Sequence, residues 1–136
     1  MSNGQVAVVV IVNRSRLGQK YQGAAGLVAQ ALDALLDSYE AREIRGRIVD
    51  VSDGPTMAAL GVPTVDDVAD ERATKDAVDA AFRQYLPDYL VLVGGPDVLT
   101  HQTLSNPLGN NGTDLGVPSD LPYASNAPYG EQISSF

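Results

Sequence analysis

The sequence predicts an α/β domain in which a small parallel sheet lies between helical layers, a three-layer sandwich with the element order β-α-β-α-β. Apolar, β-branched runs at 6–12, 47–51 and 89–93 predict strands, and the residues between them repeat apolar side chains at helical spacing. The runs at 6–12 and 89–93 are continuously apolar and do not alternate with polar residues. Such strands suit a sheet that helices cover on both faces, which is typical of parallel sheets.

The first strand and its helix have the clearest pattern. Val6–Val12 is continuously apolar, and the polar residues 13–16 end it. We expect residues 13–20 to form a loop. Helical spacing begins at Gly23 and continues to Glu43. The apolar stripe of this helix consists of Val28, Ala31, Leu32, Leu35, Leu36 and Tyr39.

A second strand and a second helix follow. Gly46 interrupts the helical pattern before the second strand, and a turn signal at 52–55 comes next, with a short helical turn expected at 57–60. We predict that Thr64 caps a long helix, which Pro87 ends. We expect right-handed crossovers between the parallel strands. The expected strand order is 2-1-3, which periodicity alone does not fix. The buried side of the long helix is predicted from its apolar residues, Val68, Ala69, Ala73, Ala77, Ala81, Phe82 and Tyr85.

The last third of the chain has no such pattern. About half of residues 94–136 are Gly, Pro, Asn or Ser, and an irregular stretch of this length is unusual inside a compact domain. We therefore expect 1–93 to form the parallel α/β core. Residues 94–136 are expected to form a long, irregular acidic loop segment of the same domain. Phe136 is expected to begin or precede a strand that continues into a missing second subdomain.

The charge balance argues against nucleic acid as a partner. The net charge is −8, and no Lys or Arg follows Arg83. Binding of phosphates without sequence preference needs clustered cations, because release of counterions drives it. The acidic surface that results favours solubility. If this acidic surface has a function, it would attract a basic substrate or a divalent cation.

The chain has no cysteine, which excludes disulfides, thiolate metal sites and a cysteine nucleophile within these residues. No basic segment precedes the first apolar run, and this run is too short to cross a bilayer. We therefore expect a cytoplasmic protein that does not bind membranes.

Candidate anion-binding groups follow the predicted strands at their carboxyl ends, where open α/β sheets bind ligands. Arg14, Arg16 and Lys20 can clamp a phosphate or a carboxylate, or belong to a solvated loop. Gly94 and Gly95 can bring backbone N–H groups close to an anion, or simply turn the chain away from the strand. No glycine-rich dinucleotide or phosphate-loop motif is present, so no cofactor is expected.

His101 is the only histidine of the chain, and histidine is the side chain type that changes charge near neutral pH when unperturbed. A hydrolase would use it as a base, with Asp97 orienting it and a serine attacking, but the chain has no Gly-x-Ser-x-Gly segment. The alternative is that His101 is an ordinary loop residue that forms hydrogen bonds. Asp97, Asp114 and Asp120 offer the oxygen ligands that calcium takes. Their spacing matches no EF-hand, and capping and turn formation are ordinary roles for such residues.

Three segments together resemble gingipain-type, caspase-like cysteine peptidases. Residues 46–53 are similar to the second strand of that family and its acidic turn, 87–95 to a strand that ends at glycine, and 119–124 to a Ser-Asp-x-x-Tyr segment. Their order and spacing agree with the family. Gly95 stands where the family usually has aspartate. The signature residues in the second half of the chain are Gly94, Gly95, Asp97, Ser119, Asp120 and Tyr123.

The resemblance implies a caspase- or flavodoxin-like sandwich that is the N-terminal scaffold subdomain of an intracellular cysteine endopeptidase. In that family the catalytic histidine and cysteine belong to the second subdomain, and no position here matches them. We therefore expect the chain alone to be inactive. Its partner would be the catalytic subdomain, which cleaves peptides by thiolate attack. The alternative is a flavodoxin-like, non-catalytic module that binds a small anion at 13–20 and 94–101, or a protein partner.

Overall fold

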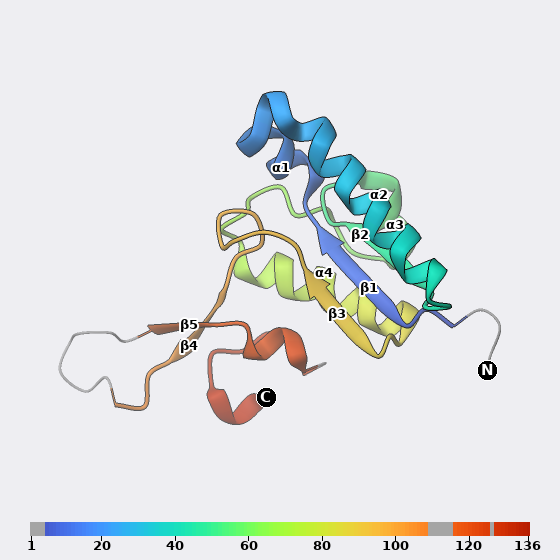
Figure 1. Cartoon of the computed structure of the whole chain (residues 1–136). Coiled ribbons are helices and arrows are strands. Elements are labelled where there is room, and N and C mark those ends of the chain that lie inside the picture. The colour runs from blue at the N-terminus through green and yellow to red at the C-terminus, as the bar shows by residue number, and fades with distance from the viewer. Residues whose placement is uncertain (1–4, 109–115, 126) are drawn as a thin grey trace.

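Strand β1 (Val8–Val12) lies in the centre of a parallel sheet, between β2 (Gly46–Asp50) and β3 (Tyr89–Leu92) (Figure 1). Both pairings are parallel and in the order β2-β1-β3. The predicted strand order 2-1-3 is therefore confirmed. This computed structural model describes residues 5–108, 116–125 and 127–136.

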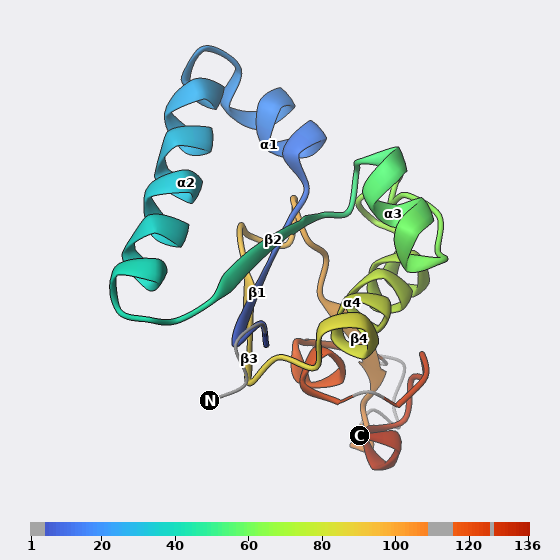
Figure 2. The ribbon, with the colours of Figure 1, turned by 90° about the vertical axis from the view of Figure 1, so that its right-hand side faces the viewer.

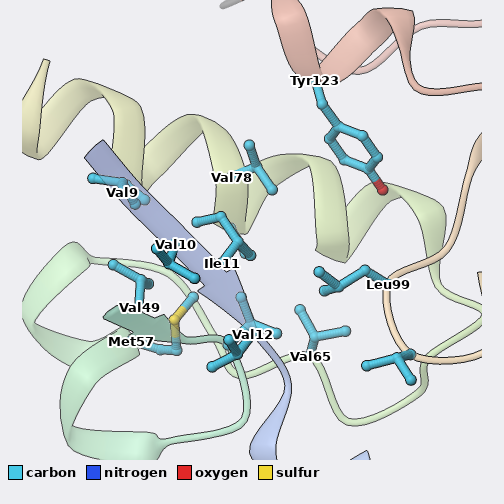
Figure 3. Packing of buried hydrophobic residues seen from close by; sticks show 14 of the residues in the cluster. Val9, Val10, Ile11, Val12, Val49, Met57, Val65, Val78, Leu99 and Tyr123 are labelled. Carbon is cyan, nitrogen blue, oxygen red and sulfur yellow. The ribbon is translucent and has the colours of Figure 1, made fainter. Parts of the chain in front are cut away.

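Helices cover both faces of this sheet (Figure 2). Helix α2 (Ala25–Ala41) packs on one face, and α3 (Gly54–Leu60) and α4 (Glu71–Tyr85) pack on the other. Every residue of β1 is buried, as expected of a central strand without polar alternation. The predicted three-layer α/β sandwich is confirmed. The core around β1 includes Val9, Ile11, Val49, Met57, Val65 and Val78 (Figure 3).

The expected loop at 13–20 is wrong, because these residues form helix α1 (Arg14–Tyr21). A 3-10 turn, η1 (Gln22–Ala24), joins it to α2. Helix α1 buries only Leu17, so it has no apolar stripe that the sequence could reveal. It begins at Asn13, whose side chain accepts a hydrogen bond from the Arg16 N–H at 2.9 Å. Its stability therefore comes from its cap and its contacts with the sheet edge.

The predicted start of the second long helix is also wrong. Helix α4 begins after Asp70, whose carboxylate accepts a hydrogen bond from the Ala73 N–H, and not after Thr64. The Thr64 hydroxyl instead donates to Asp66. The segment between α3 and α4 is held to the end of β2 because the Val65 N–H donates to the Val51 carbonyl at 2.8 Å, and Val65 is buried. The short helical turn expected at 57–60 is found as part of α3.

Residues after β3 are more regular than the sequence predicts. Strands β4 (Gln102–Ser105) and β5 (Gly116–Ser119) form an antiparallel ladder, and two 3-10 turns follow, η2 (Leu121–Ala124) and η3 (Ile133–Ser135). The continuous irregular loop expected for 94–136 is therefore wrong. The strands were missed because they are short and polar, and β5 contains glycine and proline, which are rare in strands. No helix within the described ranges is long and apolar enough to cross a bilayer.

Candidate functional site

At the carboxyl edge of the sheet, the first place to look for a ligand, a small pocket of about 140 Å³ remains, but the N–H groups at the start of α1 bond to the protein's own polar groups. The first N–H groups of α1 donate to neighbouring side chains: Arg14 to Asp50 at 3.1 Å and Ser15 to Ser52 at 3.2 Å. Asp50 also accepts from the Ser52 hydroxyl at 2.6 Å. Free N–H groups at a helix start are what would attract an anion, and here they already have acceptors.

Two of the three predicted anion-binding cations are also engaged. Lys20 Nζ lies 2.8 Å from an Asp97 carboxylate oxygen, and Arg16 Nε donates to the Asp97 carbonyl at 2.9 Å. The hydrogen bond from Lys20 lowers the pKa of Asp97, and the same contact raises the pKa of Lys20. Both side chains are exposed, so solvent screens this pair. The pair fixes the loop after β3 against α1.

Gly94 and Gly95 turn the chain away from β3. Gly94 has a φ of 112°, and a Cβ atom there would lie 2.8 Å from the Val98 Cβ. The Gly95 carbonyl accepts from the N–H groups of Val98 and Leu99. Only glycine combines this backbone conformation with this close approach, which gives Gly94 a structural role.

The predicted orientation of His101 by Asp97 is wrong. His101 Nδ1 lies 3.3 Å from Asp120 Oδ1, whereas Asp97 contacts Lys20. Within the described residues, the ring of His101 has no serine or threonine hydroxyl as a hydrogen-bond partner. The Ser119 hydroxyl, next to Asp120, accepts from the Leu121 N–H. These contacts form a histidine–carboxylate pair on the surface without an aligned nucleophile.

The three carboxylates considered for calcium do not come together as one site in what is described. Asp97 and Asp120 have different partners, and Asp114 lies outside the described residues. Across 5–108, 116–125 and 127–136, no group of three or more acidic, histidine or cysteine side chains is arranged to hold a metal ion. Calcium binding stays an expectation of the sequence.

The chain after β4 is attached to α4 by a buried polar network. Gln102 Nε2 donates to the Glu71 carbonyl at 2.7 Å and to the Tyr123 hydroxyl at 2.9 Å. The Tyr123 hydroxyl in turn donates to the Thr100 carbonyl. Burial raises the pKa of Tyr123 to about 12. The carboxylate of Glu71 accepts from the N–H and the hydroxyl of Thr103, which fixes β4 to the first turn of α4.

A buried ion pair on α4 holds the chain further along. Lys75 Nζ lies 2.6 Å from Asp79 Oδ1 and also donates to the Ser125 carbonyl at 2.7 Å. The ammonium group lies 5.7 Å from the centre of the Phe136 ring. Lys75 is fully buried and Asp79 nearly so. Burial raises the pKa of Asp79, although Lys75 acts in the opposite direction.

Beside this network lies a cleft of about 770 Å³ along β3, the candidate binding surface that we consider. One wall is the side of α4 with Asp79 and Phe82, the floor is β3, and the other wall is the segment around Tyr123 and Phe136. Strand β3 pairs only with β1 in the described sheet, so its other side faces the cleft. Its first residue, Tyr89, is 68% exposed.

Comparisons with models of known protein families, with curated proteins and with solved structures found no match for this chain.

Sequence reasoning found part of the cleft and missed the rest. Two segments singled out by the resemblance meet there, because 87–92 forms the floor and Asp120 and Tyr123 belong to the wall. Lys75 and Asp79 were missed. They lie on the polar side of the predicted helix at a spacing of four, a pattern typical of a solvated surface pair. In the structure both are buried, and Lys75 contacts Ser125 and Phe136 of the chain after β4.

Proposed function

We propose that this chain is the non-catalytic scaffold subdomain of a caspase-like cysteine endopeptidase and binds the catalytic subdomain along β3. The open edge of β3, next to a cleft of about 770 Å³, is the observation that carries the proposal. An unpaired strand edge presents backbone donors and acceptors that a second domain can continue. Natural proteins usually cover such an edge, so an exposed one beside a cleft favours a docking role.

The positions of the resembling segments support this proposal. The segments 87–95 and 119–124 are far apart in the sequence, and part of each lines the same cleft, through Asp88, Leu90 and Tyr123 among others. The signature residues Gly94, Gly95, Asp97 and Ser119 do not line it. Residues 46–53 form β2 and the turn that caps α3. The segments that resemble the family therefore lie partly at the proposed interface and partly in the sheet that supports it.

The scaffold role also agrees with the chemistry of the chain. It contains no cysteine, and its single histidine pairs with Asp120. The anion-binding alternative has less support, because the N–H groups of α1 and the side chain of Lys20 already have partners. A chain without disulfides can fold in a reducing compartment, so we place the proposed enzyme in the cytoplasm.

A peptidase assay tests the absence of catalysis. The purified chain is incubated with fluorogenic peptides that carry Arg, Lys or Asp before the reporter group. We expect no hydrolysis above that of a mock purification. Turnover that survives repeated purification and disappears in His101→Ala would contradict the proposal and favour a hydrolase that uses His101.

The partner is tested by the sequence that follows this chain in its gene. A catalytic subdomain should there show a histidine and a cysteine, each after an apolar strand. Co-expression of that segment with the chain should give a complex that elutes together and cleaves peptides in a thiol-dependent manner. A following segment that lacks both residues would overturn the cysteine-peptidase assignment.

A further inference from the structure

We propose that the cleft beside β3 binds an extended, basic peptide segment of the partner as an additional β-strand. This inference rests on the proposed scaffold function and names the chemistry of the segment that docks. Three features carry it: the backbone groups on the free side of β3, the apolar side chains next to them, and the acidic walls of the cleft.

The backbone of β3 is available for pairing on the side of the cleft. The Tyr89 N–H donates to the carbonyl of Ala7, just before β1, and the Val93 N–H donates to the carbonyl of Ile11 in β1, each at 3.0 Å. In a parallel ladder, alternate residues direct their N–H and C=O groups to opposite neighbours. Leu90 and Leu92 therefore present theirs to the cleft. A strand of four residues is about 13 Å long, which suits a short extended segment.

Apolar side chains accompany these backbone groups. Leu90 and Leu92 are only partly buried and line the cleft together with Phe82 of α4 and Phe136. Side chains on one face of a strand repeat every second residue. A docked strand with apolar residues at alternate positions would cover this surface, and polar residues would occupy the positions between them.

The charge of the cleft selects the partner. Asp79, Asp88 and Asp120 line it, and no Lys or Arg does so among the residues described there. Lys75 neutralises Asp79, which leaves as the attractive groups the carboxylate of Asp88 and that of Asp120, which stays largely exposed beside His101. Cations approaching these carboxylates from a docked strand gain a favourable interaction, whereas acidic residues are repelled.

The same charge argues against a second copy of this chain as the occupant. A two-fold pairing of β3 with itself would bring the acidic walls of both copies together. The net charge of −8 adds to this repulsion, and the chain after Arg83 offers no cation to offset it. A partner segment of opposite charge avoids this cost.

Fluorescence anisotropy tests the proposal with a labelled peptide that alternates Val with Lys or Thr. Matched probes carry Glu in place of Lys, or N-methyl groups on alternate backbone amides. We expect the basic peptide to bind at least about tenfold more tightly than the acidic one, and to weaken as salt is added. N-methylation should abolish binding, because it removes the donors that pair with β3.

Variants locate the binding surface. The double change Asp88→Asn and Asp120→Asn should weaken binding of the basic peptide about tenfold. The matched control, Asp33→Asn and Asp37→Asn on exposed positions of α2, removes the same charge from the opposite layer and should leave binding unchanged. Equal losses in both double variants would show attraction to the net charge alone and would overturn the proposal.

Amide hydrogen exchange measures directly whether backbone amides of β3 pair with the peptide. Bound peptide should slow exchange at Leu90 and Leu92, while the amides of Tyr89 and Val93 are already protected by β1. Protection confined to other elements contradicts the proposal. Self-association of the chain that protects the same two amides without peptide would identify a second copy as the occupant and also contradict it.

The two proposals fail in different ways. Mass spectrometry of the binding samples shows whether the peptide is cleaved. Binding of the basic peptide without cleavage supports both the scaffold role and the docking strand. Cleavage of the bound peptide overturns the non-catalytic role but leaves the docking strand in place. Absence of binding by every probe overturns the docking inference, whereas the scaffold assignment is still decided by the sequence that follows the chain in its gene.

Discussion

Lys75 and Asp79 form an ion pair with 2.6 Å between Nζ and Oδ1, one turn apart on α4 and almost completely covered by the chain after β4. A pair at this spacing on an exposed helix contributes about 0.3–0.5 kcal/mol. Here both charges have left water, and Ser125 supplies a further hydrogen bond to the ammonium group. The pair therefore joins the C-terminal segment to the sandwich, and loss of one partner leaves the other charge buried.

Lys75→Met should lower the free energy of unfolding by about 3 kcal/mol, because it leaves the buried carboxylate of Asp79 without its partner. Urea denaturation measures this change. The double variant Lys75→Met with Asp79→Leu should recover most of the loss, since well-packed apolar residues can replace a buried pair. Asp76→Asn, on an exposed position of the same helix, is the control and should change stability by less than about 0.5 kcal/mol. A similar cost for the single and double variants would contradict this account.

Tyr123→Phe should cost about 1–2 kcal/mol at neutral pH. The change removes the hydroxyl that donates to the Thr100 carbonyl and accepts from Gln102, and it leaves the buried Thr100 carbonyl without this donor. Tyr89→Phe is the matched control, because the side chain of Tyr89 is exposed. Chemical denaturation of both variants gives the comparison. A loss of the same size in Tyr89→Phe would refute a specific role of the buried network.

Helix α4 illustrates how far the sequence predicts this fold. Its alanine-rich side, including Ala77 and Ala81, was correctly predicted to pack on the sheet. The opposite side contains Lys75 and Asp79 and reads as solvated. Burial of that side depends on contacts with residues about fifty positions further along the chain, and local periodicity contains no information about them.

The parts of the site predicted from sequence are those with strong local signals. The strand 89–93, found as β3 at Tyr89–Leu92, and the glycine turn after it were predicted because this run is apolar throughout, although β3 lies at the edge of the sheet and is only partly buried. The partner of His101 was not predicted correctly. Asp120 lies 19 residues away across the β4–β5 ladder, and only the register of two weak strands brings the two side chains together.

Stability should fall between about pH 10 and pH 12 through Tyr123. Its pKa is raised from 10.0 to about 12 in the folded protein by burial. The folded state therefore holds a proton that the unfolded state releases above pH 10, so the contribution is complete below pH 10 and is lost as pH approaches 12. Denaturation at a series of alkaline pH values measures the slope. The free energy of unfolding of Tyr123→Phe should fall less steeply with pH than that of the wild-type chain. Identical slopes would contradict the assignment to Tyr123.

Gly94→Ala should destabilise the protein by about 1–3 kcal/mol, because an alanine at a φ of 112° is strained and its Cβ would meet the side chain of Val98. Gly26→Ala is an informative control, since Gly26 lies inside α2 and a Cβ there would meet nothing within 4 Å. That change should stabilise the protein by about 0.4–1 kcal/mol. Thermal denaturation of both variants should thus give shifts of opposite sign. Equal shifts would mean that neither the conformation nor the contact at Gly94 matters.

Thermal-shift measurements with inorganic phosphate, nucleotides and flavins should show no saturable stabilisation. The reason is that the Arg14 and Ser15 N–H groups at the start of α1 donate to Asp50 and Ser52, and Lys20 is paired with Asp97. A specific ligand at a hundredfold excess over its dissociation constant would add about 2.7 kcal/mol, which is well within detection. Arg14→Ala and Arg16→Ala separate specific from general effects. A saturable rise in melting temperature that both variants abolish would favour an anion-binding module and count against the scaffold proposal.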